Sequence, residues 1–232
     1  MLITKIQILI DTYTYIIGCL IIFSVWIIIY FLRKNIRREM IWAGLAAAPF
    51  GVTEILWVPE YWNPPSLFNL IRELGFGIED FMYMFLLGSL ASVVYEFIER
   101  KKLVKTKRSR YLHLLPILIS LASFLALELI FSDYSVYSAV FSLFLGAGVI
   151  YYIRKDLRIQ ILFGSIIFGI LYIFLFYIFT FIFPDYIAKY YTLENFLGIY
   201  ILSVPIEELL IGLSMGAFWS SIYEFVRDYK VR

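Results

Sequence analysis

The chain has 232 residues, of which 62% are hydrophobic, 20% aromatic and 16% charged. Soluble globular domains are about half apolar and about a quarter charged, and a soluble protein of this size cannot hide so much apolar surface. The composition therefore predicts an integral membrane protein and excludes a nucleic-acid module, a disordered tail and a disulfide scaffold. The net charge of +2 is too small to indicate a polyanionic partner, and the single cysteine, Cys19, has no partner for an internal disulfide.

Seven apolar runs are long enough to cross a bilayer, which requires about 20 mostly apolar residues in a helix. The first run lacks the small-residue cleavage site of a signal peptide and is therefore counted as a span. We expect an all-α integral membrane protein with seven transmembrane helices, at about 6–32, 40–58, 75–98, 111–131, 135–153, 159–183 and 196–226.

Basic residues fix the expected orientation, because Lys and Arg remain on the cytoplasmic side of a membrane. Seventeen of the 20 Lys and Arg residues lie in four clusters that follow the first, third, fifth and seventh runs. The sequence therefore predicts that the N-terminus lies outside and the C-terminus lies in the cytoplasm. The clusters occupy residues 33–38, 100–110, 154–158 and 227–232.

Several short motifs recur in the same order, at an offset that grows from about 121 to about 128 residues. The order predicts two parallel three-helix repeats, at 1–110 and 135–232, joined by a linker helix at 111–134. Parallel repeats are related by an axis along the membrane normal, so a site between them receives equivalent residues from both halves. The matched pairs are 30–37 with 151–158, 59–61 with 184–186, 78–80 with 206–208, Gly88 with Gly216, and 95–97 with 223–225.

Six acidic residues fall inside the predicted spans, where no Lys or Arg lies deep enough to neutralise them. An ionised carboxylate in hydrocarbon costs about 2.5–3.5 kcal/mol on insertion scales, so these residues are expected to face a cavity or a partner. Desolvation favours the neutral acid, and a neutral acid can donate a proton. The six are Glu54, Glu79, Asp80, Glu128, Glu207 and Glu208.

Adjacent acids on a helix point about 100° apart, so Glu79 and Asp80 cannot face one direction. We expect one member to address a cavity and the other a neighbouring helix, and the same holds for Glu207 and Glu208. The alternative is that these acids only hydrogen-bond helices together. Pro205, before the second pair, is expected to kink the seventh span and so help to line the cavity.

The remaining acids have simpler expectations. Glu128 is close to the outer boundary of its span, so solvation is its alternative. Glu54 lies one to two turns below an external loop and is expected to join the same pocket. Glu96 and Glu224 lie near the cytoplasmic ends of their spans. We expect them to form interfacial ion pairs with Arg100 and Arg227.

An aromatic, proline-rich external loop follows the second span, at residues 57–65. Trp and Tyr favour the membrane interface, so an anchoring belt is one interpretation. The other is a lid over a pocket, where aromatic faces stabilise a cation. The candidate substrate-binding residues are Trp57, Tyr61, Trp62, Tyr83 and Pro205.

Metal and cofactor chemistry lacks its usual residues. His113 is the only histidine, and there is no Cys pair, no HExxH motif and no phosphate-cradling glycine loop. No lysine in the seventh span is available for a retinal Schiff base, and no DDxxD motif is present to bind a diphosphate. The sequence therefore predicts no cofactor, no metal and no nucleic-acid partner.

The segment Val204-Pro205-Ile206-Glu207-Glu208-Leu209 and its first copy resemble the lycopene cyclase domain family. These are small membrane-integral carotenoid cyclases that occur as two-subunit, single-chain and fused forms. The family motif is P-x-E-(E/D) in duplicate halves. The second copy matches fully, whereas the first keeps the acids but has Gly77 in place of proline. The resemblance covers both halves and most of the chain.

This resemblance implies proton-initiated cyclisation of the acyclic end of lycopene or another isoprenoid, with no net redox change. An acid protonates the terminal double bond, a second double bond attacks the tertiary carbocation, and a proton leaves to form the ring. We expect Glu207 and Glu79 to handle the proton. Asp80 and Glu208 would tune them or accept it, and Glu54 would be a further member. The resemblance also implies a polyene or isoprenoid partner within the bilayer, other carotenoid-pathway enzymes or a second copy as partners, and the plasma membrane of a prokaryote.

Two alternatives remain open at this point. The plan of three helices, a linker and three helices is also that of small sugar facilitators, and buried acids would suit a proton-coupled transporter. Those facilitators carry matching prolines in both halves, whereas the prolines in the predicted spans here have no repeat partner. The second alternative is a membrane relative of the cyclases without catalytic activity.

Overall fold

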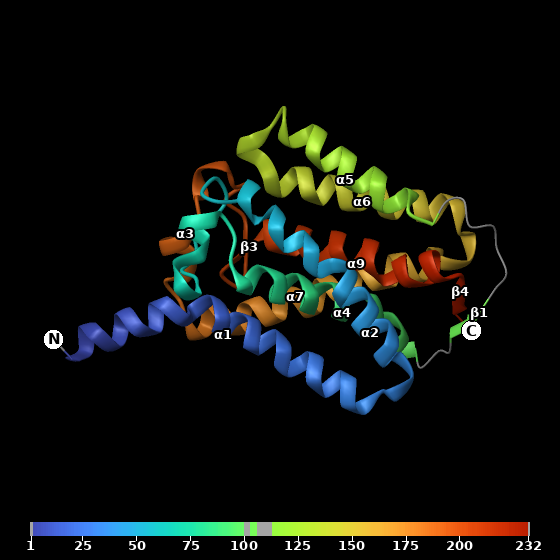
Figure 1. Ribbon diagram of the computed structural model, residues 1–232, viewed down its shortest axis with the longest axis horizontal. Helices are drawn as coiled ribbons and strands as arrows, with labels where there is room; N and C mark the ends of the chain where they lie inside the picture. Colours follow the sequence, from blue (N-terminus) through green and yellow to red (C-terminus); the bar gives the residue numbers. More distant parts are fainter. Residues whose placement is uncertain (1, 100–102, 106–112, 232) are drawn as a thin grey trace.

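The computed structural model describes residues 2–99, 103–105 and 113–231 and is dominated by long helices (Figure 1). Short 3-10 segments (η1, η3, η5, η6, η7), two short helices (α3, α8) and four short strands connect them. The long elements are α1 (Leu2–Leu32), α2 (Arg37–Ala47) continued by the 3-10 helix η2 (Ala48–Leu56), α4 (Ile78–Glu99), α5 (Leu115–Glu128), α6 (Ser135–Ile153), α7 (Arg158–Ile182) and α9 (Ile206–Arg227). The short ones are η1 (Lys34–Ile36), η3 (Leu67–Asn69), α3 (Leu70–Leu74), η5 (Ser132–Tyr134), η6 (Lys155–Leu157), α8 (Tyr186–Tyr190) and η7 (Leu193–Asn195).

Six of the helical segments in the described part of the chain are long and apolar enough to cross a membrane. The remaining expected span, the fourth at 111–131, corresponds to α5, which has only 14 residues. At 1.5 Å per residue α5 is about 21 Å long, shorter than a hydrocarbon core of about 30 Å. Residues 111–112 of that expected span lie outside the described ranges. The all-α membrane architecture thus holds, whereas the count of seven crossings stays a prediction.

Strands are the main departure from an all-α chain. β1 (Leu103–Lys105) pairs with β4 (Tyr229–Val231), and β2 (Tyr200–Ile201) pairs with β3 (Val204–Pro205), both antiparallel. The β2–β3 hairpin occupies residues expected to be helical, so the last long helix begins at Ile206 and not near 196. Its turn residues, Leu202 and Ser203, both have positive φ, as a type I′ hairpin turn requires.

The expected kink at Pro205 is wrong. Pro205 is the N-cap residue of α9, outside the helix, and its fixed φ suits the start of a helix. Glu207 and Glu208 therefore lie in the first turn of α9 and not well inside a span. Glu79 and Asp80 occupy the same place in the first turn of α4.

The internal repeat is visible in the packing. Helix α4 packs against α1 and α2, and its counterpart α9 packs in the same way against α6 and α7. A glycine lets each of these helices approach its neighbour closely: Gly88 lies where α4 meets α2, and Gly216 lies where α9 meets α7. A Cβ at Gly88 would lie 3.3 Å from the Ala43 carbonyl oxygen, and one at Gly216 would lie 2.5 Å from the Gly164 carbonyl oxygen. Helices α4 and α9 then contact each other and join the two halves.

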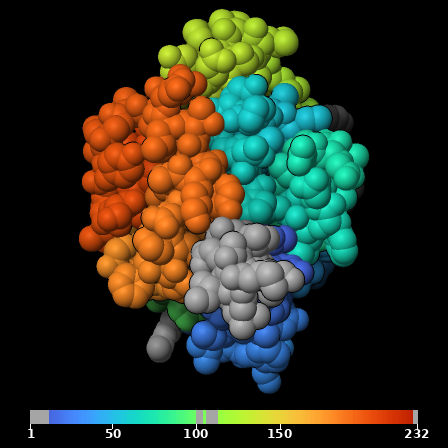
Figure 2. Space-filling model, turned by 90° about the vertical axis from the view of Figure 1, so that its left-hand side faces the viewer, coloured from blue at the N-terminus to red at the C-terminus, as the bar shows by residue number. Residues whose placement is uncertain are grey.

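The two loops that precede α4 and α9 lie side by side at one end of the molecule (Figure 2). The Asn63 amide donates to the Tyr190 carbonyl oxygen at 2.7 Å, and the Thr192 amide donates to the Tyr61 carbonyl oxygen at 2.9 Å. The Thr192 hydroxyl donates a third hydrogen bond between the loops, to the Pro59 carbonyl oxygen at 2.8 Å. We call these joined loops, residues 57–77 and 183–205, the loop clasp.

The chain termini lie at opposite ends of the long axis (Figure 1). The loop clasp is at the end near the N-terminus, and the β1–β4 pair is at the other end. Which end faces the cytoplasm stays a prediction from the basic clusters.

Candidate functional site

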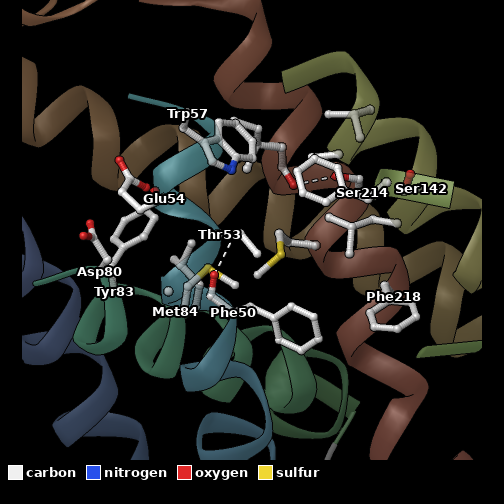
Figure 3. Close-up of a pocket in the computed structure, with 18 of the residues that line it drawn as sticks. Phe50, Thr53, Glu54, Trp57, Asp80, Tyr83, Met84, Ser142, Ser214 and Phe218 are labelled. Atoms are coloured by element: carbon white, nitrogen blue, oxygen red, sulfur yellow. Dashed lines mark hydrogen bonds between the residues drawn. The ribbon is translucent and has the colours of Figure 1, made fainter. Parts of the chain in front are cut away.

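A pocket lies beneath the loop clasp, between η2, α4, α5, α6 and α9, and its space including the mouth is about 1130 Å³ (Figure 3). Aromatic and aliphatic side chains form most of its wall, and no Lys or Arg is among its lining residues in the described part of the chain. Apolar walls with a few converging polar groups are typical of a binding site for an apolar molecule.

Three carboxyl groups face this pocket, one from each of three elements. They belong to Glu54 of η2, Asp80 of α4 and Glu208 of α9. Figure 3 shows Glu54 and Asp80 together on one side of the pocket, with Ser142 and Phe218 on the opposite side. The pocket thus has an acidic side near the loop clasp and an apolar side deeper in the bundle.

The other member of each acid pair points away from the pocket. Glu79 Oε1 accepts a hydrogen bond from the Leu67 amide at 2.5 Å, and Glu207 Oε1 accepts one from the Leu197 amide at 2.7 Å. The hydroxyl of Tyr137 also donates to Glu207 Oε1, at 2.7 Å. In both repeats the first acid of the pair therefore ties the preceding loop to the start of its helix.

Glu208 accepts hydrogen bonds from three tyrosines. Tyr61 and Tyr191 donate to Oε1, each at 2.8 Å, and Tyr172 donates to Oε2 at 2.7 Å. The hydroxyls of Tyr172 and Tyr83 are also hydrogen-bonded to each other. Glu208 is only 2% exposed, so these donors replace the water that would otherwise solvate its charge.

Asp80 and Glu54 are held differently. The Tyr15 hydroxyl donates to Asp80 Oδ1 at 2.5 Å, and the Gly77 amide donates to Oδ2 at 2.6 Å. Glu54 accepts a bond from the Trp62 indole. Glu54 and Asp80 are close enough to interact electrostatically. Because no described Lys or Arg lines the pocket, two neighbouring carboxyls favour holding one proton between them.

Two tyrosines of the loop clasp have strongly perturbed acidity. Burial raises the pKa of Tyr61 and of Tyr191 well above the usual value of a tyrosine, and the neighbouring charge of Glu208 acts in the same direction. Both hydroxyls therefore remain neutral hydrogen-bond donors at any ordinary pH.

Of the candidate substrate-binding residues, Trp57, Tyr61, Trp62 and Tyr83 line the pocket. Pro205 is buried but does not line it, because it starts α9 behind the acids. The structure adds side chains that sequence reasoning missed, namely Tyr15, Tyr172, Tyr191, Phe218 and Trp219. A tyrosine among many aromatic residues in apolar helices carries no distinguishing signal in a single sequence.

The contact between the end of η2 and helix α5, which we call the seam, lies at the edge of the pocket. Trp57 stacks on Phe124 of α5 with ring centroids 6.4 Å apart, and both line the pocket. A groove runs along the outer side of the same seam, between the end of η2 and the end of α5. Glu128 lies in this groove and accepts a hydrogen bond from the Ser135 hydroxyl at 2.9 Å. The acid therefore belongs to the seam and not to the pocket.

Comparison with known proteins gives one family. The family described as lycopene cyclase matches residues 11–98 and again residues 133–226, so the two matches fall on the two repeats. No curated protein and no solved structure matches the chain significantly.

Proposed function

Because the chain belongs to the lycopene cyclase family, we propose that this multi-pass membrane protein cyclises the end of a polyene such as lycopene in the pocket beneath the loop clasp. The observation that supports the proposal is that Glu54, Asp80 and Glu208 all line one aromatic, apolar pocket. The first two come from the first repeat and the third from the second. A hydrocarbon chain fits such walls, and of the described lining residues the three carboxyl groups are the strongest acids available to protonate an alkene.

The proton donor in this proposal is the Glu54–Asp80 pair. A proton shared by two carboxyls moves to the less substituted carbon of the terminal double bond, and a tertiary carbocation forms on the dimethyl-substituted carbon of that bond. A second double bond attacks this carbon and closes the six-membered ring. The Tyr15 and Trp62 bonds hold the two acids at the wall of the pocket, which is the positioning that general acid catalysis requires.

Glu208 is the proposed stabiliser of the positive charge and the acceptor of the departing proton. Hydrogen bonds from three hydroxyls favour the ionised form of a carboxyl group. A fixed negative charge in a dry pocket stabilises a carbocation more than it stabilises the neutral polyene. Loss of a proton to Glu208 then forms the ring double bond, with no net oxidation or reduction. The rings of Trp57, Phe218 and Trp219 in the pocket wall add cation–π stabilisation.

Glu79 and Glu207, the acids expected from sequence to handle the proton, are assigned a positioning role in this proposal. Each bonds the backbone of a loop segment, and neither lines the pocket. Substitution of either should loosen the loop clasp and change the yield of folded protein before it changes the chemistry.

The test is expression in a host that accumulates lycopene, followed by chromatography of the pigments. The wild-type chain should yield cyclised carotenoid. Asp80→Asn and Glu208→Gln, which keep the size of the side chain, should each lower conversion by about 10²-fold or more. Glu73→Gln, at an exposed position on α3, is the matched control and should convert as wild type does.

Protein level and detergent-solubilised size-exclusion profiles distinguish lost chemistry from lost folding. The proposal fails if folded Asp80→Asn and Glu208→Gln both cyclise lycopene normally. If only folded Glu79→Gln and Glu207→Gln lose conversion, Glu79 and Glu207 carry out the proton transfer instead of Asp80 and Glu208.

A further inference from the structure

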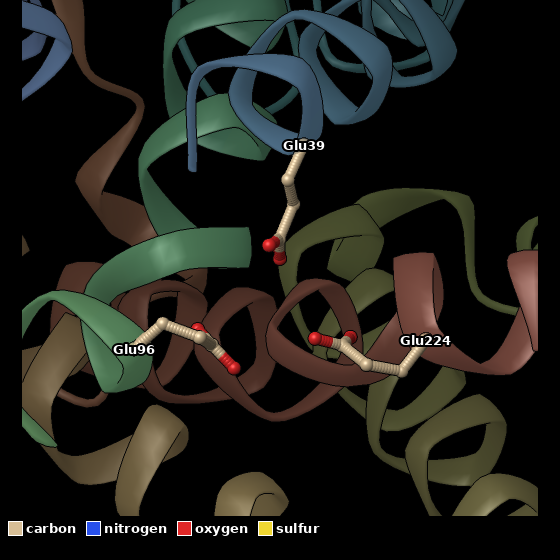
Figure 4. A group of neighbouring side chains, drawn as sticks. All are labelled: Glu39, Glu96 and Glu224. Carbon is tan, nitrogen blue, oxygen red and sulfur yellow. The ribbon is translucent and has the colours of Figure 1, made fainter. Parts of the chain in front are cut away.

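A second cluster of acids lies in the bundle, away from the pocket, and joins three helices (Figure 4). Glu39 of α2, Glu96 of α4 and Glu224 of α9 each direct a carboxyl group toward a common centre. One oxygen from each can be chosen so that all three lie within 4.8 Å of one another. All three side chains are at most 1% exposed. The interfacial ion pair expected for Glu224 is therefore wrong, and Arg100, expected beside Glu96, lies outside the described residues.

The cluster lies between the two repeats. Glu96 and Glu224 are repeat equivalents, and Glu39 is the equivalent of Gln160, two residues beyond the matched Arg37 and Arg158. The Gln160 amide nitrogen donates to Glu96 Oε1 at 2.7 Å. Gln160 is 2% exposed, and its Oε1 has no hydrogen-bond partner in the described part of the chain. Each half thus contributes two oxygen-bearing side chains.

The carboxyl groups of Glu39 and Glu224 are poorly satisfied. Both carboxyl oxygens of each are buried and accept no hydrogen bond of normal geometry from the described residues, and the interactions of Glu224 with Gln160 and Glu96 lie within the cluster. The buried Arg154 does not hydrogen-bond these carboxyl groups among the contacts described: it donates to the backbone carbonyl oxygen of Glu224 at 3.3 Å and to the Asp156 carboxylate at 2.8 Å. An uncompensated buried carboxylate is strongly unfavourable, so the cluster must be neutralised, either by protons or by a bound cation.

We propose that Glu39, Glu96, Glu224 and Gln160 bind one hard divalent cation, of the class of Mg²⁺, Ca²⁺ and Mn²⁺. Carboxylate and amide oxygens are the ligands that these ions prefer, and among the described residues no histidine or cysteine belongs to the cluster. Metal–oxygen distances of about 2.0–2.6 Å place opposite ligands about 4–5 Å apart, which agrees with the spacing of the three carboxyl oxygens.

The proposed cation site is separate from the proposed active site. On α4, Glu96 comes 16 residues after Asp80, which corresponds to about 24 Å along a helix. None of the four ligand residues lines the pocket. A cation there would tie α2, α4, α7 and α9 together at the end of the bundle away from the loop clasp. The site does not depend on the proposed cyclase activity.

The experiment measures metal content and thermal stability of the purified full chain in detergent. After dialysis against metal-free buffer, the wild type should retain about one divalent ion per chain by elemental analysis. Removal of the ion with EDTA should lower Tm by several degrees, and Mg²⁺, Ca²⁺ or Mn²⁺, added singly, should restore it in a saturable way.

Glu39→Gln and Glu224→Gln should weaken binding of the restoring ion at least about tenfold and make Tm insensitive to EDTA. Glu73→Gln, the exposed control, should respond as wild type does. If folded wild type carries no divalent ion and its Tm responds neither to EDTA nor to the three ions, the proposal is overturned and protons neutralise the cluster. The wild-type titration decides the matter even if a glutamine variant fails to fold.

Discussion

At the scale of single residues, the direction of neighbouring side chains decides which acids meet the pocket. Both pairs occupy the first turn of a helix, and adjacent positions point about 100° apart. The sequence therefore predicts that one member of each pair faces a cavity. The sequence does not tell which member faces the cavity, because that depends on which acid the loops before α4 and α9 contact. Those loops present their amides to Glu79 and Glu207, which leaves Asp80 and Glu208 for the pocket.

The three tyrosines around Glu208 supply a first prediction at this scale. Tyr61→Phe and Tyr172→Phe each remove one hydroxyl donor and leave the ring in place. Loss of a hydrogen bond to a charged group costs about 1.5–3 kcal/mol, so each variant should slow cyclisation by about 10- to 100-fold. Initial rates of pigment conversion in membranes would measure the effect. Tyr13→Phe, on the exposed side of α1, is the matched control. Unchanged rates in both variants would remove Glu208 from the chemistry.

The raised pKa values of Tyr61 and Tyr191 supply a second prediction. Because burial favours the neutral hydroxyl, neither group should ionise near the usual tyrosine pKa of about 10. In a spectrophotometric titration of the folded protein, Tyr61→Phe should leave the tyrosinate signal below about pH 11 unchanged. The same substitution should reduce the signal of the unfolded chain by one tyrosine. A smaller folded-state signal in the variant would mean that Tyr61 is accessible to solvent.

The raised pKa values also determine how the stability of the protein changes with pH. The folded chain holds these two protons more tightly than the unfolded chain does, so their contribution to stability is complete below the unfolded pKa. It is lost as the pH rises from about 10 toward the folded pKa. Tyr61→Phe should therefore make the fall in Tm above that pH less steep, because one of the contributing groups is gone.

The sequence located much of the pocket but not its hydrogen bonds. Glu54, Trp57 and Trp62 are near one another in the chain, and the repeat relates Asp80 to Glu208, so their grouping was foreseeable. The bond from Tyr61 to Glu208 joins residues 147 positions apart. Neither residue type nor periodicity reports such a contact. It results from the loop clasp, which forms only when the two halves meet.

At the scale of elements, hydropathy predicts the long helices well and their ends less well. The span expected at 135–153 coincides with α6, because apolar residues continue to the basic cluster that ends it. The last span was expected to begin near 196, since residues 196–205 are also largely apolar. Within this segment Leu202 and Ser203 have positive φ and form a hairpin turn. Apolar composition alone does not distinguish a short strand from a helix.

Close helix packing in the second repeat supplies a third prediction. In Gly216→Ala the new methyl group would lie 2.5 Å from the Gly164 carbonyl oxygen and 2.8 Å from the Phe168 Cβ. Since backbone must move to admit it, the free energy of unfolding should fall by about 1–3 kcal/mol. Gly148→Ala is the matched control, because a Cβ there meets nothing within 4 Å. Thermal unfolding in detergent should show a lower Tm for Gly216→Ala and an equal or higher Tm for Gly148→Ala. The reverse order would contradict tight packing of α7 on α9.

At the scale of the whole molecule, the pocket needs both repeats. The first half brings Glu54, Asp80 and Tyr61, and the second brings Glu208 with Tyr172 and Tyr191. The halves hold together through α4 and α9 and through the loop clasp. This arrangement explains why the two copies of the acid motif are informative as a pair, since each copy supplies only one side of the site.

A divided chain tests this dependence and is the fourth prediction. If the chain is cut between Lys105 and His113 and the halves are co-expressed, they should assemble, because the contacts that join them are hydrogen bonds and helix packing with no covalent part. A tag on the first half should co-purify the second, and lycopene should be cyclised only when both are present. Tyr61→Phe in the first half should reduce the conversion as it does in the intact chain, since Tyr61 donates to Glu208 across the boundary. Conversion by either half alone would show that the acids of one repeat suffice, and the shared pocket would then have no catalytic role.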